Sequence, residues 1–112
     1  MRLGKRQEAF SRLVPRLIDK AHELGFEVRG GDWFRDPRAF GEIGDEGPYG
    51  SDVSEHKNKC AIDLNLRKPG FGMVWHTEGH RELGEWWEEQ DPMCRWGGRY
   101  NDGNHYEFLE WR

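Results

Sequence analysis

The chain has 112 residues, which is enough for one domain that buries roughly two-thirds of its unfolded surface, so we take residues 1–112 as a single domain. Charged residues make up 34% of the chain, yet the net charge is −4 and the Lys and Arg residues are scattered, which argues against nucleic acid as a partner. No stretch resembles a membrane span or a secretory signal. We therefore expect no membrane insertion and a cytoplasmic location.

The clearest predicted element is a helix over residues 5–24. Its apolar residues recur every three or four positions and form one stripe that can pack on a sheet. Gly25 is a natural stop, while Pro15 predicts either a kink or two separate helical pieces. Residues 26–34 are predicted to form a strand, in which the pair Gly30-Gly31 indicates a bulge or a close approach of two backbones.

Residues 36–53 are rich in Gly, Asp and Pro and are expected to form a long loop over a cleft. Residues 60–66 then predict a strand with two different faces. Alternate positions from Cys60 to Leu66 are apolar and form the core face, while Asp63 lies on the opposite face beside the small Ala61. This alternation leaves Asp63 on the cleft side of the predicted sheet.

A turn at residues 68–72 is expected to lead into a second antiparallel strand. Thr77 is the predicted N-cap of a helix over residues 78–89. His76 and His80 are four residues apart, but they lack the HExxH pattern, so we expect His80 to be a surface or packing residue of that helix. Two cysteines are too few for a disulfide framework and are interpreted as reduced, buried thiols.

The last part of the chain predicts a strand over residues 94–100, a turn over 101–104 and a final strand. In this final strand His105 and Glu107 share one face, while Tyr106 and Phe108 share the other. The Gly97-Gly98 pair in the preceding strand indicates either a bulge or a backbone that passes close to a ligand.

Two distant segments together offer the ligands of a zinc site. The first has His56 and Asp63 with six residues between them, and the second has Asp102 and His105 with two residues between them. A bend at the polar residues 57–59 is needed to bring His56 to the same side as Asp63. Catalytic zinc commonly takes three protein ligands of N and O type and leaves a fourth position for water. His56, Asp63 and His105 are therefore a chemically sufficient set, with Asp102 placed to act as a base.

Two motifs carry a resemblance to a known family. The first reads Ser-x-His, then six residues, then Asp, with Ala two positions before that Asp; here it comprises Ser54, His56, Ala61 and Asp63. The second is a Trp-Gly-Gly stretch followed by an acid, two residues and a His, here Trp96-Gly97-Gly98, Asp102 and His105. In these motifs the chain resembles the zinc peptidases that include vancomycin-resistance-type D-Ala-D-Ala dipeptidases and carboxypeptidases and many phage endolysins. The resemblance extends from about residue 35 to residue 108.

The resemblance implies an α+β fold of the hedgehog and DD-peptidase type, with a small antiparallel sheet packed against helices and a zinc site in a cleft on the sheet. It implies that His56, Asp63 and His105 bind Zn²⁺ and that Asp102 is the general base. It also implies that Arg35 holds the substrate's carboxylate or the developing oxyanion.

Three further positions are of interest. Ser54 is a candidate for hydrogen bonding near the site, with a role in shaping the turn before His56 as the alternative. Glu107 is a candidate for orienting a ligand or the substrate's amine, with an exposed strand residue as the alternative interpretation. The chain departs from many members of the family at Lys59, where those members have Gly.

The predicted function is that of a monomeric zinc peptidase that cleaves the stem peptides of bacterial peptidoglycan, similar to single-domain phage endolysins. Because no signal is evident, such an enzyme reaches the cell wall only if it is released, as in phage lysis. Two alternatives stay open. One is a D-Ala-D-Ala dipeptidase or carboxypeptidase, and the other is a non-catalytic binding domain in which zinc is a structural clamp.

Overall fold

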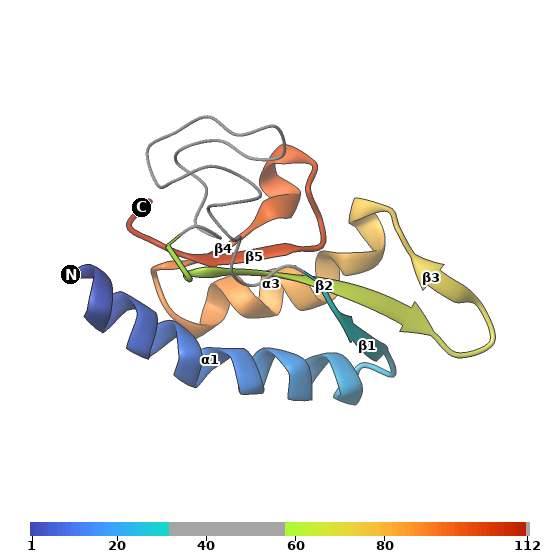
Figure 1. Cartoon of the computed structure of the whole chain (residues 1–112). Coiled ribbons are helices and arrows are strands. Elements are labelled where there is room, and N and C mark those ends of the chain that lie inside the picture. The colour runs from blue at the N-terminus through green and yellow to red at the C-terminus, as the bar shows by residue number, and fades with distance from the viewer. Residues whose placement is uncertain (32–57, 112) are drawn as a thin grey trace, which may run out of the picture.

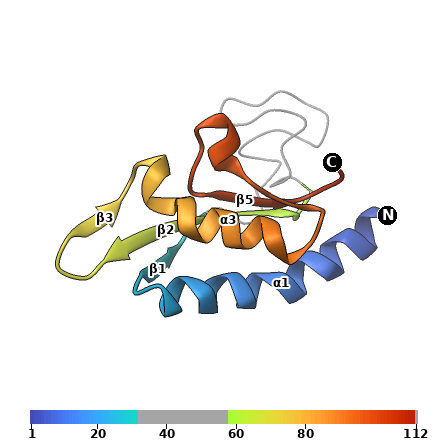
Figure 2. The same ribbon diagram turned by 180° about the vertical axis from the view of Figure 1, so that it is seen from behind.

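The computed structural model of the chain describes residues 1–31 and 58–111. These residues form an α+β fold in which two helices pack on one face of an antiparallel sheet. Figures 1 and 2 show the sheet from two opposite sides, and in both views α1 and α3 lie together on the same side of it. The predicted fold class, a small antiparallel sheet packed against helices, is confirmed.

Helix α1 spans Leu3–Glu23 and buries the predicted apolar stripe, which comprises Phe10, Val14, Leu17 and Ala21. It continues through Pro15, so the prediction of two separate pieces is wrong. Proline removes one helical hydrogen bond, but the stripe on both sides of it packs into the core and keeps the helix together. The helix ends as expected at Gly25, whose φ of 93° is readily adopted by glycine.

In the described residues the sheet has five strands in the order β1-β2-β5-β4, with β3 also paired to β2. Their bounds are Glu27–Gly30 (β1), Ala61–Lys68 (β2), Gly72–Val74 (β3), Cys94–Trp96 (β4) and His105–Phe108 (β5). All pairings are antiparallel, and β2 is the central strand, since β1, β3 and β5 all pair with it. The predicted turn between β2 and β3 is confirmed, and the hairpin extends away from the helices in Figure 1.

The two faces of the sheet follow the predicted alternation. The apolar side chains of β2 and β5 face the helices and form the core, with Ile62, Leu64, Leu66, Tyr106 and Phe108 all buried. Cys60 and Cys94 are both buried, as expected. The alternate positions of the same strands point away from the helices, and the candidate site lies on that second face.

Two element boundaries differ from the predictions. The helix expected at 78–89 is a 3-10 helix, η1 (Thr77–His80), followed by α3 (Arg81–Gln90). Thr77 is not its side-chain cap, because its hydroxyl instead hydrogen-bonds Asn101 Oδ1 at 3.1 Å. The strand expected at 94–100 ends at Trp96, where a second 3-10 helix, η2 (Gly97–Tyr100), begins.

The remaining expectations about the scaffold concern the membrane and the N-terminal strand. Within the described residues, neither helix has the length and apolar character needed to cross a membrane. The strand predicted at 26–34 is seen as β1, and the positions after Gly31 lie outside the described residues, as does the loop predicted at 36–53.

Candidate metal centre

Asp63 and His105 form the centre of the candidate site. They are direct cross-strand partners in the antiparallel pairing of β2 with β5. Their side chains meet on the face of the sheet opposite the helices, where Asp63 Oδ1 lies 3.1 Å from His105 Nδ1. His105 is buried, and Asp63 is partly buried. A carboxylate and an imidazole predicted from segments 42 residues apart in the sequence are therefore in contact.

The third predicted zinc ligand, His56, lies outside the described residues, as do Ser54 and Arg35. Among residues 1–31 and 58–111, no three His, Cys, Asp or Glu side chains are grouped so as to hold a metal ion. The described part of the chain thus brings together two of the three predicted ligands.

The turn that carries Asp102 is fixed against its surroundings. The Asp102 amide donates to the Gly97 carbonyl at 2.9 Å, and the His105 amide donates to the Asp102 carbonyl at 3.1 Å. Trp96 Nε1 donates to the Gly103 carbonyl at 2.7 Å. Asp102 is exposed at this turn. The predicted turn is confirmed, and these bonds hold the backbone of Asp102 in a defined place relative to His105.

Gly97 is needed for this arrangement. A Cβ atom on Gly97 would lie 2.2 Å from the Asp102 carbonyl oxygen and 2.8 Å from His105 Cβ. The close approach at Gly97 is thus to the turn of the site itself, and the predicted approach of this backbone to a ligand stays a prediction. Gly31 plays a similar part on the other edge of β2, because its amide donates to the Asp63 carbonyl at 2.9 Å and a Cβ there would lie 2.8 Å from the same oxygen.

Glu107 is buried, with 3% of its surface exposed, so its interpretation as an exposed strand residue is wrong. Its Oε2 lies 3.3 Å from His105 Nε2. Its Oε1 accepts hydrogen bonds from Arg95 Nε and from the Tyr100 hydroxyl, each at 2.7 Å. The imidazole of His105 thus lies between two carboxylates, those of Asp63 and Glu107.

Sequence reasoning did not find Arg95 or Tyr100. Arg95 is the cross-strand partner of Glu107, and it points away from the core because it alternates with the buried residues Cys94 and Trp96. Alternation in that strand was a usable signal for Arg95. Tyr100 had no such signal, since it belongs to the 3-10 helix η2 and not to the predicted strand.

The carboxylates determine the charge of this cluster. Burial disfavours a charged ring, but hydrogen bonds to Asp63 and Glu107 outweigh it and raise the pKa of His105 to about 9. Burial also opposes ionisation of Glu107, yet hydrogen bonds from His105, Tyr100 and Arg95 lower its pKa to about 2. In the metal-free protein near neutral pH His105 is therefore a cation, and a metal ion that binds to it must displace a proton.

Lys59, at the approach to β2, has an unusual backbone conformation. Its φ is 59°, in the left-handed region that favours glycine. This is the position at which many members of the resembled family have Gly. The turn therefore has a conformation suited to glycine, although the residue here is lysine.

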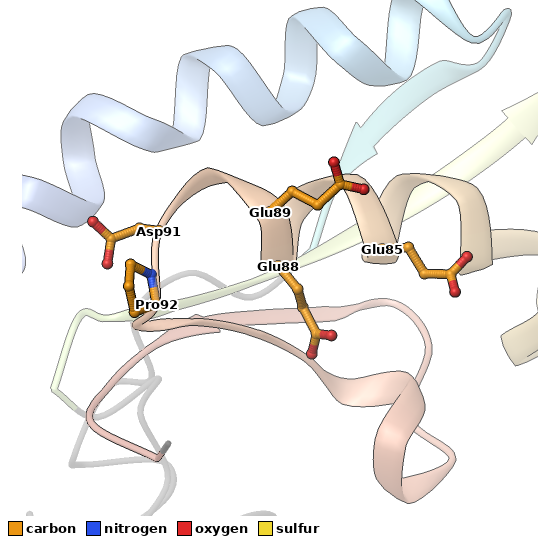
Figure 3. Close-up of a pocket in the computed structure, with 5 residues that line it drawn as sticks. All are labelled: Glu85, Glu88, Glu89, Asp91 and Pro92. Atoms are coloured by element: carbon orange, nitrogen blue, oxygen red, sulfur yellow. The ribbon is translucent and has the colours of Figure 1, made fainter.

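Within residues 1–31 and 58–111, the other histidine pair belongs to no group that could hold a metal ion. His80 is buried and bonds the Tyr106 hydroxyl and the Val74 carbonyl, both at 3.1 Å, whereas His76 is exposed. The packing role expected for His80 is confirmed. A separate pocket near α3 is lined by Glu85, Glu88, Glu89, Asp91 and Pro92 (Figure 3). Asp63 and His105 are not among its lining residues.

A scan of protein-family models finds no match to this chain, and a search of curated proteins likewise finds no relative. The arguments about function therefore come from the residues and their geometry, together with the two sequence motifs.

Proposed function

We propose that the chain is a zinc-dependent peptidase that hydrolyses amide bonds in the stem peptides of bacterial peptidoglycan. The observation that carries the proposal is the contact between Asp63 and His105, two predicted ligands from remote segments that meet on one face of the sheet. Their neighbour in sequence and structure is the turn that carries the predicted base, Asp102.

The geometry of the pair fits a zinc ion. Two donors that each lie about 2.0–2.1 Å from one tetrahedral zinc ion are about 3.3 Å apart. Asp63 Oδ1 and His105 Nδ1 are 3.1 Å apart, so a zinc ion could replace the proton between them with little movement of either strand. His56 is proposed as the third ligand from its spacing in the sequence. One carboxylate and two imidazoles are a donor set that zinc accepts.

Bound zinc supplies a Lewis acid that polarises the amide carbonyl and lowers the pKa of a water molecule. In the proposed reaction Asp102 accepts the proton of the attacking water and then delivers it to the leaving amine. Asp102 is suited to this because its carboxyl group is exposed while its backbone is fixed by bonds to Gly97 and His105. Arg35 is proposed to stabilise the oxyanion or a substrate carboxylate, and Ser54 to hydrogen-bond near the site.

The substrate class rests on the resemblance. The two motifs, Ser54 to Asp63 and Trp96 to His105, occur in the same order in peptidases that act on D-Ala-containing peptides and on cell walls. The structure adds a reason for the Trp-Gly-Gly part, since Trp96 and Gly97 both contact the turn of Asp102.

The test is mass analysis of the fragments released when the purified chain is incubated with peptidoglycan, with and without a chelator. Release that requires the metal supports the proposal, and the masses identify the bond that is cut. Asp102→Asn should keep stoichiometric zinc and lose hydrolysis. If hydrolysis survives this substitution, Asp102 is not the base.

The same assay separates the alternatives. A chain that binds zinc tightly but releases no fragment from peptidoglycan is a metal-stabilised binding domain. A chain that releases D-Ala from D-Ala-D-Ala dipeptide, but nothing from intact walls, is a dipeptidase or carboxypeptidase.

A further inference from the structure

Glu107 presents its two carboxylate oxygens to different partners. Oε1 accepts from Tyr100 and from Arg95, whose Nε and Nη2 both lie 2.7 Å away. Oε2 faces His105 Nε2 at 3.3 Å. Because a guanidinium group has only donors, the end of the side chain at position 107 that faces Arg95 must be an acceptor.

The Arg95 side chain is itself held in place. Its guanidinium carbon lies 5.1 Å from the centre of the Tyr100 ring and 5.8 Å from that of Trp111. Burial raises the pKa of Tyr100, and the neighbouring carboxylate of Glu107 raises it further, so the hydroxyl keeps its proton and remains a donor. Arg95 and Tyr100 therefore both stay protonated and remain hydrogen-bond donors to Oε1.

The other end of this arrangement faces His105. A carboxylate oxygen can only accept, so His105 Nε2 carries a proton when it contacts Glu107 Oε2, and Nδ1 carries one when it contacts Asp63 Oδ1. If a metal ion takes the place of the proton on Nδ1, the proton that remains on the ring is the one on Nε2, which Glu107 accepts. Nδ1 is the nitrogen required for a metal ion shared with Asp63.

We propose that Arg95, Tyr100 and Glu107 form a positioning unit for His105, in which Glu107 fixes the ring with its proton on Nε2 and so directs Nδ1 to the metal beside Asp63. The inference rests on the proposed zinc site. It assigns Glu107 to His105 and not to the substrate, since Glu107 is buried and both of its oxygens already have protein partners. Carboxylate partners of this kind typically change metal affinity by about 10–100-fold.

Glu107→Gln tests the proposal because it keeps the shape of the side chain. The Gln oxygen must face Arg95, so its amide NH₂ group faces His105 Nε2. Two donors then oppose each other unless the ring moves its proton to Nδ1, where it blocks the metal. The measured quantity is the zinc dissociation constant, from competition with a chromophoric chelator, and we expect it to rise by about 10–100-fold.

Two further variants provide controls. Glu88→Gln makes the same chemical change at another paired carboxylate, whose oxygens accept from Arg99 at 2.7 and 2.8 Å and from the Trp96 amide at 3.0 Å, and which does not contact His105. It should leave zinc affinity unchanged. Tyr100→Phe removes one of the donors to Oε1 while Arg95 remains, so we expect a smaller, few-fold rise of the dissociation constant. Circular dichroism and thermal unfolding establish that each variant is folded.

A folded Glu107→Gln variant with the wild-type zinc dissociation constant would overturn the inference. If that variant does not fold, Tyr100→Phe decides, and an unchanged constant there would also overturn it. Wall hydrolysis is scored separately. If the wild-type chain hydrolyses walls and Glu107→Gln leaves the zinc dissociation constant unchanged, only the inference fails. If Glu107→Gln weakens zinc binding but the wild-type chain hydrolyses no walls, only the peptidase proposal fails.

If the wild-type chain binds no zinc, the proposed function fails, and nitrogen-15 NMR of a metal-free Asp63→Ala variant then decides the inference, because that variant lacks the carboxylate that competes for the proton on Nδ1. At alkaline pH, where the ring is neutral, His105 should carry its proton on Nε2 in Asp63→Ala and on Nδ1 when Glu107→Gln is added. The same tautomer in both variants would overturn the inference.

Discussion

Two buried histidines occupy opposite faces of the same sheet. His80 is 1% exposed and lies on the core side, where its partners are the Tyr106 hydroxyl and the Val74 carbonyl. His105 is 7% exposed and lies on the other side, between the carboxylates of Asp63 and Glu107. The two rings are similarly buried, but one has neutral partners and the other has anionic ones.

The difference teaches that the partners of a buried histidine, more than its burial, decide what it can do. Burial lowers the pKa of His80, so the ring stays neutral: Nε2 donates to Val74 and Nδ1 accepts from Tyr106. At His105 the two carboxylates outweigh burial, and its pKa is raised to about 9. At the proposed metal site a metal ion would therefore have to displace the proton that these carboxylates stabilise on the ring.

The largest expected effect comes from removing each histidine in turn. His105→Ala should reduce bound zinc from about one ion per chain to none and abolish wall hydrolysis, because a catalytic site with three protein ligands loses one of them. His80→Ala should keep its zinc but lose about 1–3 kcal/mol of unfolding free energy, since buried hydrogen bonds are broken. Metal analysis and urea unfolding measure the two quantities. Unchanged zinc content in His105→Ala would remove that residue from the ligand set.

The alternation of residues along β2 and β5 made both faces predictable from the sequence. Asp63 lies between two apolar neighbours that enter the core, and His105 is followed by Tyr106, which also enters it, so their common face followed from the period of the strands. The strand register that makes them direct partners did not follow, since pairing between remote strands depends on the whole sheet.

The supporting contacts were harder to predict. Tyr100 hydrogen-bonds Glu107 because the chain leaves β4 at Trp96 and continues as the 3-10 helix η2. The predicted strand over 94–100 did not include this helix, so the contact could not be predicted. The prediction of Thr77 as a helix cap was wrong for a related reason. Its hydroxyl has a tertiary partner, Asn101, which lies 24 residues away in the sequence and replaces the local bond that a cap would have made.

A second way to separate the two faces is Gly97→Ala. The new Cβ would collide with the Asp102 carbonyl oxygen at 2.2 Å and approach His105 Cβ at 2.8 Å. Both neighbours are rigid, so we expect a loss of about 1–3 kcal/mol in unfolding free energy together with weaker zinc binding. Gly30→Ala is the matched control, because a Cβ there meets nothing within 4 Å. Equal stability of the two variants would show that the turn is more adaptable than its contacts indicate.

Tyr106→Phe should affect only the His80 side. It removes the hydroxyl that bonds His80 Nδ1 at 3.1 Å and leaves the aromatic ring in the core. We expect a loss of about 1 kcal/mol in unfolding free energy, the usual net contribution of a buried hydrogen bond. Zinc affinity, measured by chelator competition, should stay the same, because the Tyr106 side chain lies on the opposite face from His105. A large loss of zinc affinity would mean that the two faces are coupled.

The smallest expected effect is the pH dependence that His80 confers. Burial is the main cause of its lowered pKa; nearby His76 lowers it further, while the Val74 hydrogen bond and the charge of Asp102 oppose the shift. The folded protein therefore binds this proton less well than the unfolded chain, whose histidines titrate at about 6.5. The stability associated with neutral His80 is fully present above that value and is lost as the pH falls below it.

Urea unfolding of the metal-free protein at pH 7.5 and at pH 5.5 would measure this loss. His105, with its pKa of about 9, is already protonated at both pH values in the folded state, so His80 is the histidine of the pair that picks up a proton in the fold across this range. His80→Gln cannot be protonated and should lose less stability between the two pH values than the wild type does. Carboxylates titrate alike in both proteins, and so does His105, whose raised pKa adds the same stability to both as the pH falls, so the difference between the two pH-dependent changes isolates His80. Equal changes would mean that the neutral partners of His80 do not disfavour its charged form, and the contrast between the two histidines would then rest on His105 alone.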